Sequence, residues 1–202
     1  MTQRGRPRKF DRSIALRQAM DVFWTQGFDC TSMPDLIGAM KINSPSIYAA
    51  FGSKEKLFIE AVELYSVTEG EEIWVRMANE PTARLAIEAM LQASAEAYTR
   101  PAKPRGCMIV LGALHTEGGN TAIRRGLQAH RAQCMTTIHS RLELGISDGE
   151  LAKRLDCRAI ATFYLTIQQG MSIQARDGAS REALLAVVKY AIVAWDSIIS
   201  GA

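Results

Sequence analysis

The chain has 202 residues, of which 48% are hydrophobic and 22% charged, the ordinary balance of a soluble globular protein with one large or two small cores. No stretch approaches the roughly 18 to 20 consecutive apolar residues of a membrane span, and no apolar region follows the basic N-terminus, so neither a membrane anchor nor a signal peptide is predicted. Four cysteines (Cys30, Cys107, Cys134 and Cys157) lack CxxC spacing, which indicates reduced thiols in the cytoplasm rather than a disulfide or zinc framework.

All of the net positive charge lies in the first quarter of the chain. Residues 1–55 hold 8 Lys+Arg and 5 Asp+Glu, and residues 56–202 hold 16 of each, so the net charge of +3 belongs to the N-terminal part. Five cations lie there beside a single acid, Asp11: Arg4, Arg6, Arg8, Lys9 and Arg12. Such a local excess suits phosphate groups, although a basic terminus of this length often serves only solubility.

Residues 1–10 are expected to form a basic arm. Gly5 and Pro7 keep the segment Arg4–Arg8 out of a helix, and its narrow extended backbone fits a minor groove, where A·T tracts attract arginine. The segment resembles the core of an AT-hook. Because a five-residue pattern is weakly specific, we expect the arm to supplement another DNA-binding element.

A three-helix module is predicted next. Residues 11–26 repeat apolar side chains at helical spacing and end at Gly27, a helix stop. Ser32 and Asp35 then have the spacing of a capping box, which predicts a short helix running to about Lys41.

A second short helix follows after about three residues. Asn43 or Ser44 can cap it, Pro45 occupies its first turn, and Gly52 followed by Ser53 ends it and starts the next helix. Two short helices joined in this way form the helix-turn-helix layout.

The second short helix has two distinct sides. Ile47 and Phe51 are four residues apart and mark its buried side. The opposite side is small and uncharged and carries one phenol: Pro45 and Ala49, flanked by Ser46 and Tyr48. Such a surface can lie flush in a major groove, whereas the alternative is an ordinary helical hairpin inside a core.

These residues resemble the N-terminal signature of the tetracycline-repressor (TetR) family over about 50 positions. The matching residues are Ala15, Ala19, Phe23, Gly27-Phe28, Thr31-Ser32, Asp35-Leu36, Ile42-Asn43, Ser46-Ile47-Tyr48, Phe51-Gly52-Ser53-Lys54-Glu55 and Leu57-Phe58. The resemblance implies an all-α protein of about nine helices. In it, a helix-turn-helix DNA-binding domain (11–55) is controlled by a C-terminal ligand-binding and dimerisation domain (56–202).

In the family pattern the positions of Thr31, Tyr48 and Lys54 contact phosphates, and the start of the third helix reads bases. The DNA-binding residues expected here are Arg4, Arg6, Arg8, Lys9, Thr31, Ser32, Asn43, Ser44, Pro45, Ser46, Tyr48, Ala49 and Lys54. Two departures stand out: the recognition helix has no Lys or Arg, and Lys56 replaces the acid that usually completes the cap begun by Ser53. Without an arginine to read guanine, we expect a site whose contacted positions are biased toward T and A.

Six further helices are predicted, at residues 53–77, 82–100, 106–115, 120–144, 156–176 and 180–200. The first, running out of the DNA module as one long helix, is the expected mechanical link between domains. The last has an apolar arc wider than one core needs, which favours a subunit interface, with a fully buried helix as the alternative. The expected interface residues are Ile160, Ile167, Leu184, Val188, Ala191, Ile192, Trp195 and Ile199.

Soft and aromatic side chains between residues 74 and 174 favour a pocket for an organic effector with apolar surface, although they would serve equally as core. The candidates are Trp74, Met77, Met90, Met108, Leu111, His115, His130, Cys134, Phe163, Tyr164, Ile167 and Met171.

Metal or redox sensing is the alternative for the effector, because His130 and Cys134 are four residues apart and Cys107 or Cys157 could supply a third ligand. Enzyme activity is not expected. Cys107 and His115, placed on one helix, would lie about 12 Å apart, too far for a nucleophile and its base, and no other catalytic motif is present. We therefore assign no catalytic residue, metal site or cofactor.

The sequence thus predicts a cytoplasmic, homodimeric transcriptional regulator without a membrane partner, most simply a repressor. Its partners would be a palindromic double-stranded DNA operator and a small-molecule effector that releases it. Two recognition helices would enter successive major grooves about 34 to 36 Å apart. An architectural A·T-groove binder that relies on the GRPR arm is the competing class.

Overall fold

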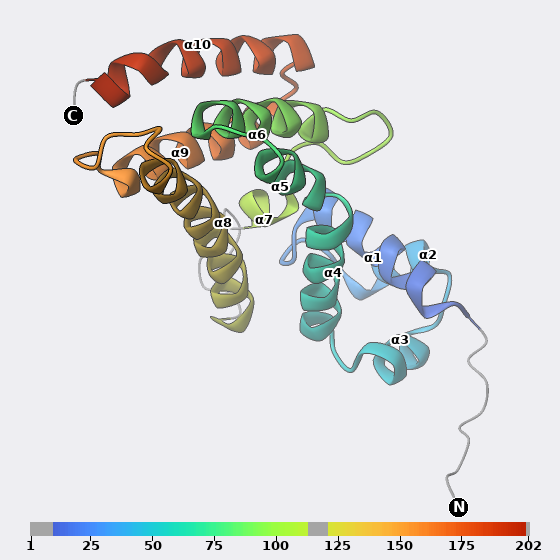
Figure 1. The fold of residues 1–202 in the computed structure, drawn as a ribbon. Coiled ribbons are helices and arrows are strands. Elements are labelled where there is room, and N and C mark those ends of the chain that lie inside the picture. The colour runs from blue at the N-terminus through green and yellow to red at the C-terminus, as the bar shows by residue number, and fades with distance from the viewer. Residues whose placement is uncertain (1–9, 113–120, 201–202) are drawn as a thin grey trace, which may run out of the picture.

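The computed structural model describes residues 10–112 and 121–200, and every regular element in these ranges is a helix. The helices are α1 (Arg12–Gln26), α2 (Met33–Met40), α3 (Ser44–Phe51), α4 (Lys54–Thr68), α5 (Glu71–Ala78), α6 (Ala83–Tyr98), α7 (Met108–Leu111), α8 (Thr121–Ser147), α9 (Cys157–Arg176) and α10 (Arg181–Ser200). Figure 1 shows α1–α3 gathered beside α4 at one end and the remaining helices forming a larger body. The predicted all-helical class is confirmed.

Local caps explain where the first helices begin. The Ser32 Oγ accepts from the Asp35 N–H at 3.3 Å and the Ser32 N–H donates to the Asp35 carboxylate at 2.8 Å, which is the predicted capping box. The hydrogen bond that the Ser32 hydroxyl donates to the Asp35 carboxylate at 2.6 Å, and then the one from the Ser32 N–H, hold the pKa of Asp35 below its ordinary value. Asn43 accepts from the Ser46 N–H at 2.9 Å, and Ser53 caps α4. Each start is therefore specified by residues within one turn.

An aromatic cluster joins α1 to α4. The rings of Phe23 and Phe28 meet the Phe58 ring edge-on, with centroids 5.1 and 5.3 Å away, and all three side chains are buried. At the other end of α1, the Arg12 guanidinium donates to both Glu60 carboxylate oxygens, at 2.8 and 2.6 Å. Both ends of α1 are thus attached to α4.

The prediction of one long helix at 53–77 is wrong. The segment forms two helices, α4 and α5, which are separated at Glu69 and Gly70. The Glu69 carboxylate is only 8% exposed and is drawn toward Lys103 and Arg100, with N···O distances of 2.6 and 3.2 Å. The Gly70 N–H bonds back to the Tyr65 carbonyl at 2.9 Å, which closes the end of α4. Distant ion pairs and a glycine therefore end the helix where apolar periodicity would continue it.

The predicted helix at 106–115 is a single turn, α7, within the described residues. Gly106 precedes it with φ +77, and a Cβ there would lie 2.6 Å from the Ser172 carbonyl oxygen. The backbone therefore approaches α9 more closely than any side chain would permit. In contrast, α8 runs to Ser147, three residues past the predicted end.

The larger body is built around α6, of whose 16 residues 11 are buried. Helices α5, α8, α9 and α10 pack against it. The inner stripe of α10 is buried within the protomer, whereas its outer side remains apolar and exposed: Val187 40%, Tyr190 73% and Val193 65%. Helix α10 is long and apolar enough to cross a membrane, by length and composition only. Of its most apolar stretch 28% is buried, which leaves a broad apolar surface uncovered.

Candidate functional site

The outer side of α3 is the first candidate surface. Ile47 and Phe51 are buried, whereas Tyr48 is 47% exposed. The remaining predicted contact residues also reach the surface: Asn43, Pro45 and Ala49 exposed, Ser44 and Ser46 half-buried. The helix lies at an end of the molecule, as Figure 1 shows, so its small uncharged side can approach a flat partner.

The flanking residues differ in their availability. Lys54 extends over the Phe28 ring, with its Nζ 4.4 Å from the centroid, and remains half-exposed beside α3. Ser32 is exposed, although its hydroxyl already donates to Asp35 at 2.6 Å. The Thr31 side chain does not reach the surface, as the expected phosphate contact would require. It is 1% exposed, and its Oγ1 donates to the Gly27 carbonyl at 2.6 Å. Thr31 thus supports the turn between α1 and α2.

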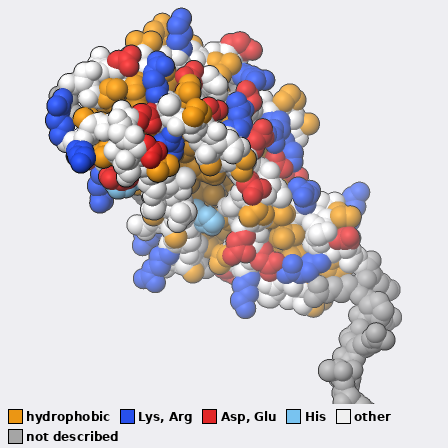
Figure 2. Space-filling view, in the orientation of Figure 1, with side chains coloured by type: hydrophobic (Ala, Val, Ile, Leu, Met, Phe, Trp, Pro, Cys, Tyr) orange, Lys and Arg blue, Asp and Glu red, His pale blue; other side chains and the backbone are white. Residues whose placement is uncertain are grey.

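The predicted arm residues Arg4, Arg6, Arg8 and Lys9 lie outside the described residues. On the face seen in Figure 2, cations and carboxylates alternate over the larger body without gathering into a patch of one sign. On this face the distribution agrees with the even charge of residues 56–202.

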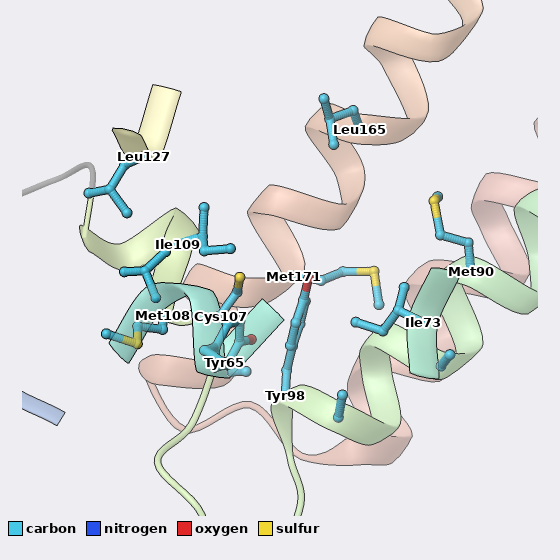
Figure 3. Packing of buried hydrophobic residues seen from close by; sticks show 14 of the residues in the cluster. Tyr65, Ile73, Met90, Tyr98, Cys107, Met108, Ile109, Leu127, Leu165 and Met171 are labelled. Atoms are coloured by element: carbon cyan, nitrogen blue, oxygen red, sulfur yellow. The ribbon is translucent and has the colours of Figure 1, made fainter. Parts of the chain in front are cut away.

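A partly enclosed cavity of about 190 Å³ is the second candidate site. It lies among α4 to α9, and Figure 3 shows Tyr65, Tyr98 and Cys107 close together at its wall. Its lining combines apolar and aromatic side chains with seven polar or charged ones: Tyr65, Ser66, Gly70, Ile73, Trp74, Tyr98, Cys107, Ile109, Val110, His130, Arg131, Gln133, Cys134, Thr137, Leu165, Gln168 and Gln169. This composition is typical of small-molecule sites.

Of the predicted pocket residues, Trp74, His130 and Cys134 line this cavity. Six others are buried outside its lining: Met77, Met90, Met108, Leu111, Tyr164 and Met171. Tyr164, for example, donates to the Ala191 carbonyl at 3.2 Å and so joins α9 to α10. Phe163 is 42% exposed, Ile167 is half-buried, and His115 lies outside the described residues.

Sequence reasoning missed Tyr65, Tyr98, Arg131 and Gln168 as lining residues. At helical spacing the two tyrosines have the pattern of ordinary core positions, and Gln168 gives no signal because its partner, the Ser94 hydroxyl at 2.9 Å, lies on α6. Arg131 is adjacent in sequence to His130, whose spacing from Cys134 indicates a possible metal ligand instead. Only the packing of several helices assembles these groups.

The thiols near the cavity are protonated at neutral pH. Burial raises the pKa of Cys107 and raises the pKa of Cys134 to about 12. Burial likewise raises the pKa of Cys157 to about 11. In the described residues no group of three or more His, Cys, Asp or Glu gathers as a metal site. The metal and redox alternatives therefore gain no support from this geometry.

The cavity wall contacts the α1–α3 module through Trp24. The indole Nε1–H donates to the Gly106 carbonyl at 3.1 Å, and the ring meets the Tyr65 ring edge-on at 4.8 Å. Arg176, at the end of α9, donates to the carbonyls of Trp24 and Thr25 at 3.0 and 2.7 Å. The C-terminal end of α1 is thus held by Tyr65, which lines the cavity, by Gly106, which precedes the lining residue Cys107, and by the end of α9.

The outer surfaces of α9 and α10 leave a shallow apolar groove. It is lined by Ala159, Ile160, Phe163, Ala194, Ser197 and Ile198. Five predicted interface residues instead belong to the protomer's own core: Leu184, Val188, Ala191, Ile192 and Trp195. Ile167 and Ile199 are half-buried and can still contribute to an outer surface.

The chain matches the family described as "Bacterial regulatory proteins, tetR family" over residues 15–61, and the "Tetracyclin repressor-like, C-terminal domain" over residues 81–190. It is 30% identical to the HTH-type transcriptional repressor ComR of Escherichia coli, over 97% of this chain and 94% of that repressor. It is also 30% identical to the HTH-type transcriptional repressor BdcR of the same organism, over 93% and 90%. The solved structure of a cysteine mutant of the TetR family transcriptional regulator CifR, complexed with 26bp double-strand operator DNA, is 43% identical. It has a TM-score of 0.91 and covers 95% of this chain and 100% of that one.

Proposed function

Because the chain belongs to the TetR family of bacterial regulatory proteins, we propose that it is a transcriptional repressor released from its operator by a small organic molecule. The observation that carries this proposal is the pairing of an exposed, uncharged face on α3 with a cavity whose wall contacts the same module through Trp24. The likeness to a regulator whose structure was solved in complex with operator DNA supports a double-stranded DNA partner and hence a cytoplasmic location.

In this proposal α3 enters the major groove and reads bases without a positive charge. Asn43, Ser46 and Ala49 face the base edges, while Tyr48 and Lys54 contact phosphates on either side. Selection from a random DNA library should return half-sites biased toward T and A at the contacted positions. A half-site rich in G·C would refute this account of base reading.

The proposed dimer forms through the outer sides of α9 and α10. The side chains of Val193 and Phe163 are 65% and 42% exposed, so these outer sides offer apolar surface that a partner protomer can cover. Val193→Glu should convert the dimer to a monomer in sedimentation, with the helical content unchanged. Val67→Glu, at a 61% exposed position on α4, is the matched control and should stay dimeric.

Release would follow from a shift between two spacings of the recognition helices. Because α4 and α5 are separate helices, the signal cannot pass along one rigid rod, and the Trp24 contacts with Tyr65 and Gly106 offer the direct route. An occupant of the cavity that displaces Tyr65 also displaces the end of α1. Operator affinity should then fall without unfolding of either domain.

Fluorescence anisotropy on a selected operator tests the whole proposal. Tight, salt-dependent binding by the unliganded protein is expected, and the proposal fails if no such binding occurs. The architectural alternative predicts that removal of residues 1–9 abolishes binding, whereas the helix-turn-helix predicts modest, uniform weakening. The relatives, which are helix-turn-helix repressors, do not favour that alternative.

A further inference from the structure

The cavity is lined by a cation, Arg131, and no described lining residue is a carboxylate. Among the described residues that line it, Arg131 and His130 are basic, and none is Asp or Glu. The Arg131 guanidinium is half-buried, and its Nη1 makes only a long hydrogen bond among the described residues, to the Ile109 carbonyl at 3.4 Å. A buried charge without a close partner is costly, so this position favours whatever supplies a negative charge.

Other half-buried arginines of the same body are satisfied. Arg76 pairs with Glu96 at 2.8 Å, and Arg100 with Glu72 at 2.8 Å. Arg105, which pairs with no carboxylate among the described residues, donates instead to the Ala175 carbonyl at 2.7 Å. Arg131 differs from these three because, among the described residues, it has neither a paired carboxylate nor a short hydrogen bond, and burial lowers the pKa of its guanidinium.

The remaining walls would not repel an anion. Cys107 and Cys134 are held as neutral thiols by burial, which raises the pKa of each. The hydroxyl of buried Tyr98 is likewise neutral, since burial raises its pKa well above the ordinary value. The same cavity is lined by the rings of Tyr65 and Trp74 and by the Leu165 side chain, which provide apolar surface. A ligand with one anionic end and one aromatic body matches both features.

Size narrows the ligand further. A cavity of about 150 Å³ lined by apolar side chains holds one benzene ring. At about 190 Å³, this cavity has room for a ring with one small substituent. A planar carboxylate suits the guanidinium best, because the two can form parallel hydrogen bonds.

From these observations we infer that the effector is a single-ring aromatic carboxylate whose carboxylate pairs with Arg131. The inference rests on the proposed function, since it identifies the chemical class of the molecule that releases the repressor. It gives Arg131 the role of anchoring residue and Tyr65 and Trp74 that of the walls that hold the ring.

The test compares benzoate and the ring-methylated benzoates with benzamide, a neutral molecule of the same shape. Calorimetry on the full-length protein should show binding of at least one benzoate, and benzamide should bind about 10- to 100-fold more weakly. Arg131→Met should remove that preference by weakening benzoate alone, and Arg131→Lys should retain part of it. Arg124→Met, at an exposed position on the same helix, should change nothing.

Three outcomes would overturn the inference: no binding by any benzoate at millimolar concentration, equal binding of benzamide, or an unchanged preference in Arg131→Met. Circular dichroism and thermal unfolding of each variant separate a lost anchor from a lost fold, and the Lys variant covers the case in which Met does not fold. The proposed function is judged apart from this, by operator binding of the unliganded wild-type protein. Intact operator binding without a preference for anions would reject the carboxylate and leave the repressor proposal standing.

Discussion

Replacing Trp24 by Phe should separate DNA binding from its control. The change removes the indole N–H that donates to the buried Gly106 carbonyl at 3.1 Å and leaves that oxygen without this donor. An unpaired buried polar group costs about 1–3 kcal/mol, and the smaller ring leaves a gap beside Tyr65. We expect the free energy of unfolding to fall by about 2–3 kcal/mol, which a domain with about 5–15 kcal/mol of stability survives.

The effect on control should be larger than the effect on binding. Allosteric coupling typically amounts to about 1–3 kcal/mol, which corresponds to a roughly 5- to 150-fold change in operator affinity between free and liganded protein. In Trp24→Phe the α3 surface is untouched, so unliganded affinity should stay within about threefold of wild type while the ligand-induced change shrinks toward twofold.

Anisotropy titrations of one operator, with and without a saturating cavity ligand, measure both quantities. Arg176→Met removes the second attachment of α1, at the carbonyls of Trp24 and Thr25, and should weaken control in the same direction. Arg158→Met, at an exposed position on the same helix α9, is the matched control and should behave as wild type. A full ligand response in Trp24→Phe would refute the coupling route.

Three further predictions concern individual positions. Gly106→Ala should destabilise the protein by at least about 2 kcal/mol in urea titrations, because its φ of +77 and the Ser172 oxygen 2.6 Å from its Cβ position leave no space. Gly126→Ala should stabilise the protein by up to about 1 kcal/mol, because a Cβ at this position of α8 meets no heavy atom within 4 Å. A Gly126→Ala variant less stable than Gly106→Ala would contradict this packing. Lys54→Met should lower the slope of log affinity against log salt by about one per protomer, whereas exposed Lys153→Met should not; equal slopes would remove Lys54 from the interface. The lowered pKa of Asp35 means that its cap contributes stability above the unfolded-state pKa and loses it as the pH falls through the folded-state value. The advantage of wild type over Asp35→Asn in thermal unfolding should therefore disappear in acid, and a difference that grew below about pH 4 would contradict this sign.

The sequence predicted those features whose causes are local. The starts of α2, α3 and α4 follow from Ser32, Asn43 and Ser53, because each cap bonds to a backbone N–H only three residues away. The small face of α3 follows from helical spacing alone. Such features need no knowledge of the rest of the chain.

Features that depend on distant partners could not be predicted. The end of α4 depends on Glu69 meeting Arg100 and Lys103, which follow it by more than 30 residues. The cavity forms where the apolar side chains of several helices leave space between them. Periodicity cannot predict this space, because Tyr65, which lines the cavity, and Met77, which does not, have the same pattern. On α10 the width of the apolar arc was visible, but not that α6 and α9 cover one half of it and leave the other exposed.

The contacts at the two ends of α1 connect the cavity to α3. The C-terminal end of α1 is held beside the cavity, while at its N-terminal end Arg12 donates to the Ala50 carbonyl of α3 at 3.4 Å and lies 4.4 Å from the Phe51 ring. A helix of 15 residues is about 22 Å long, so a tilt of about 5° at the cavity end displaces the other end by roughly 2 Å. Hydrogen bonds to base edges hold over only a few tenths of an ångström around about 3 Å. In the proposed mechanism, a small movement of Tyr65 and Trp24 would therefore be enough to shift α3 relative to its operator, without any change in the surface of α3 itself.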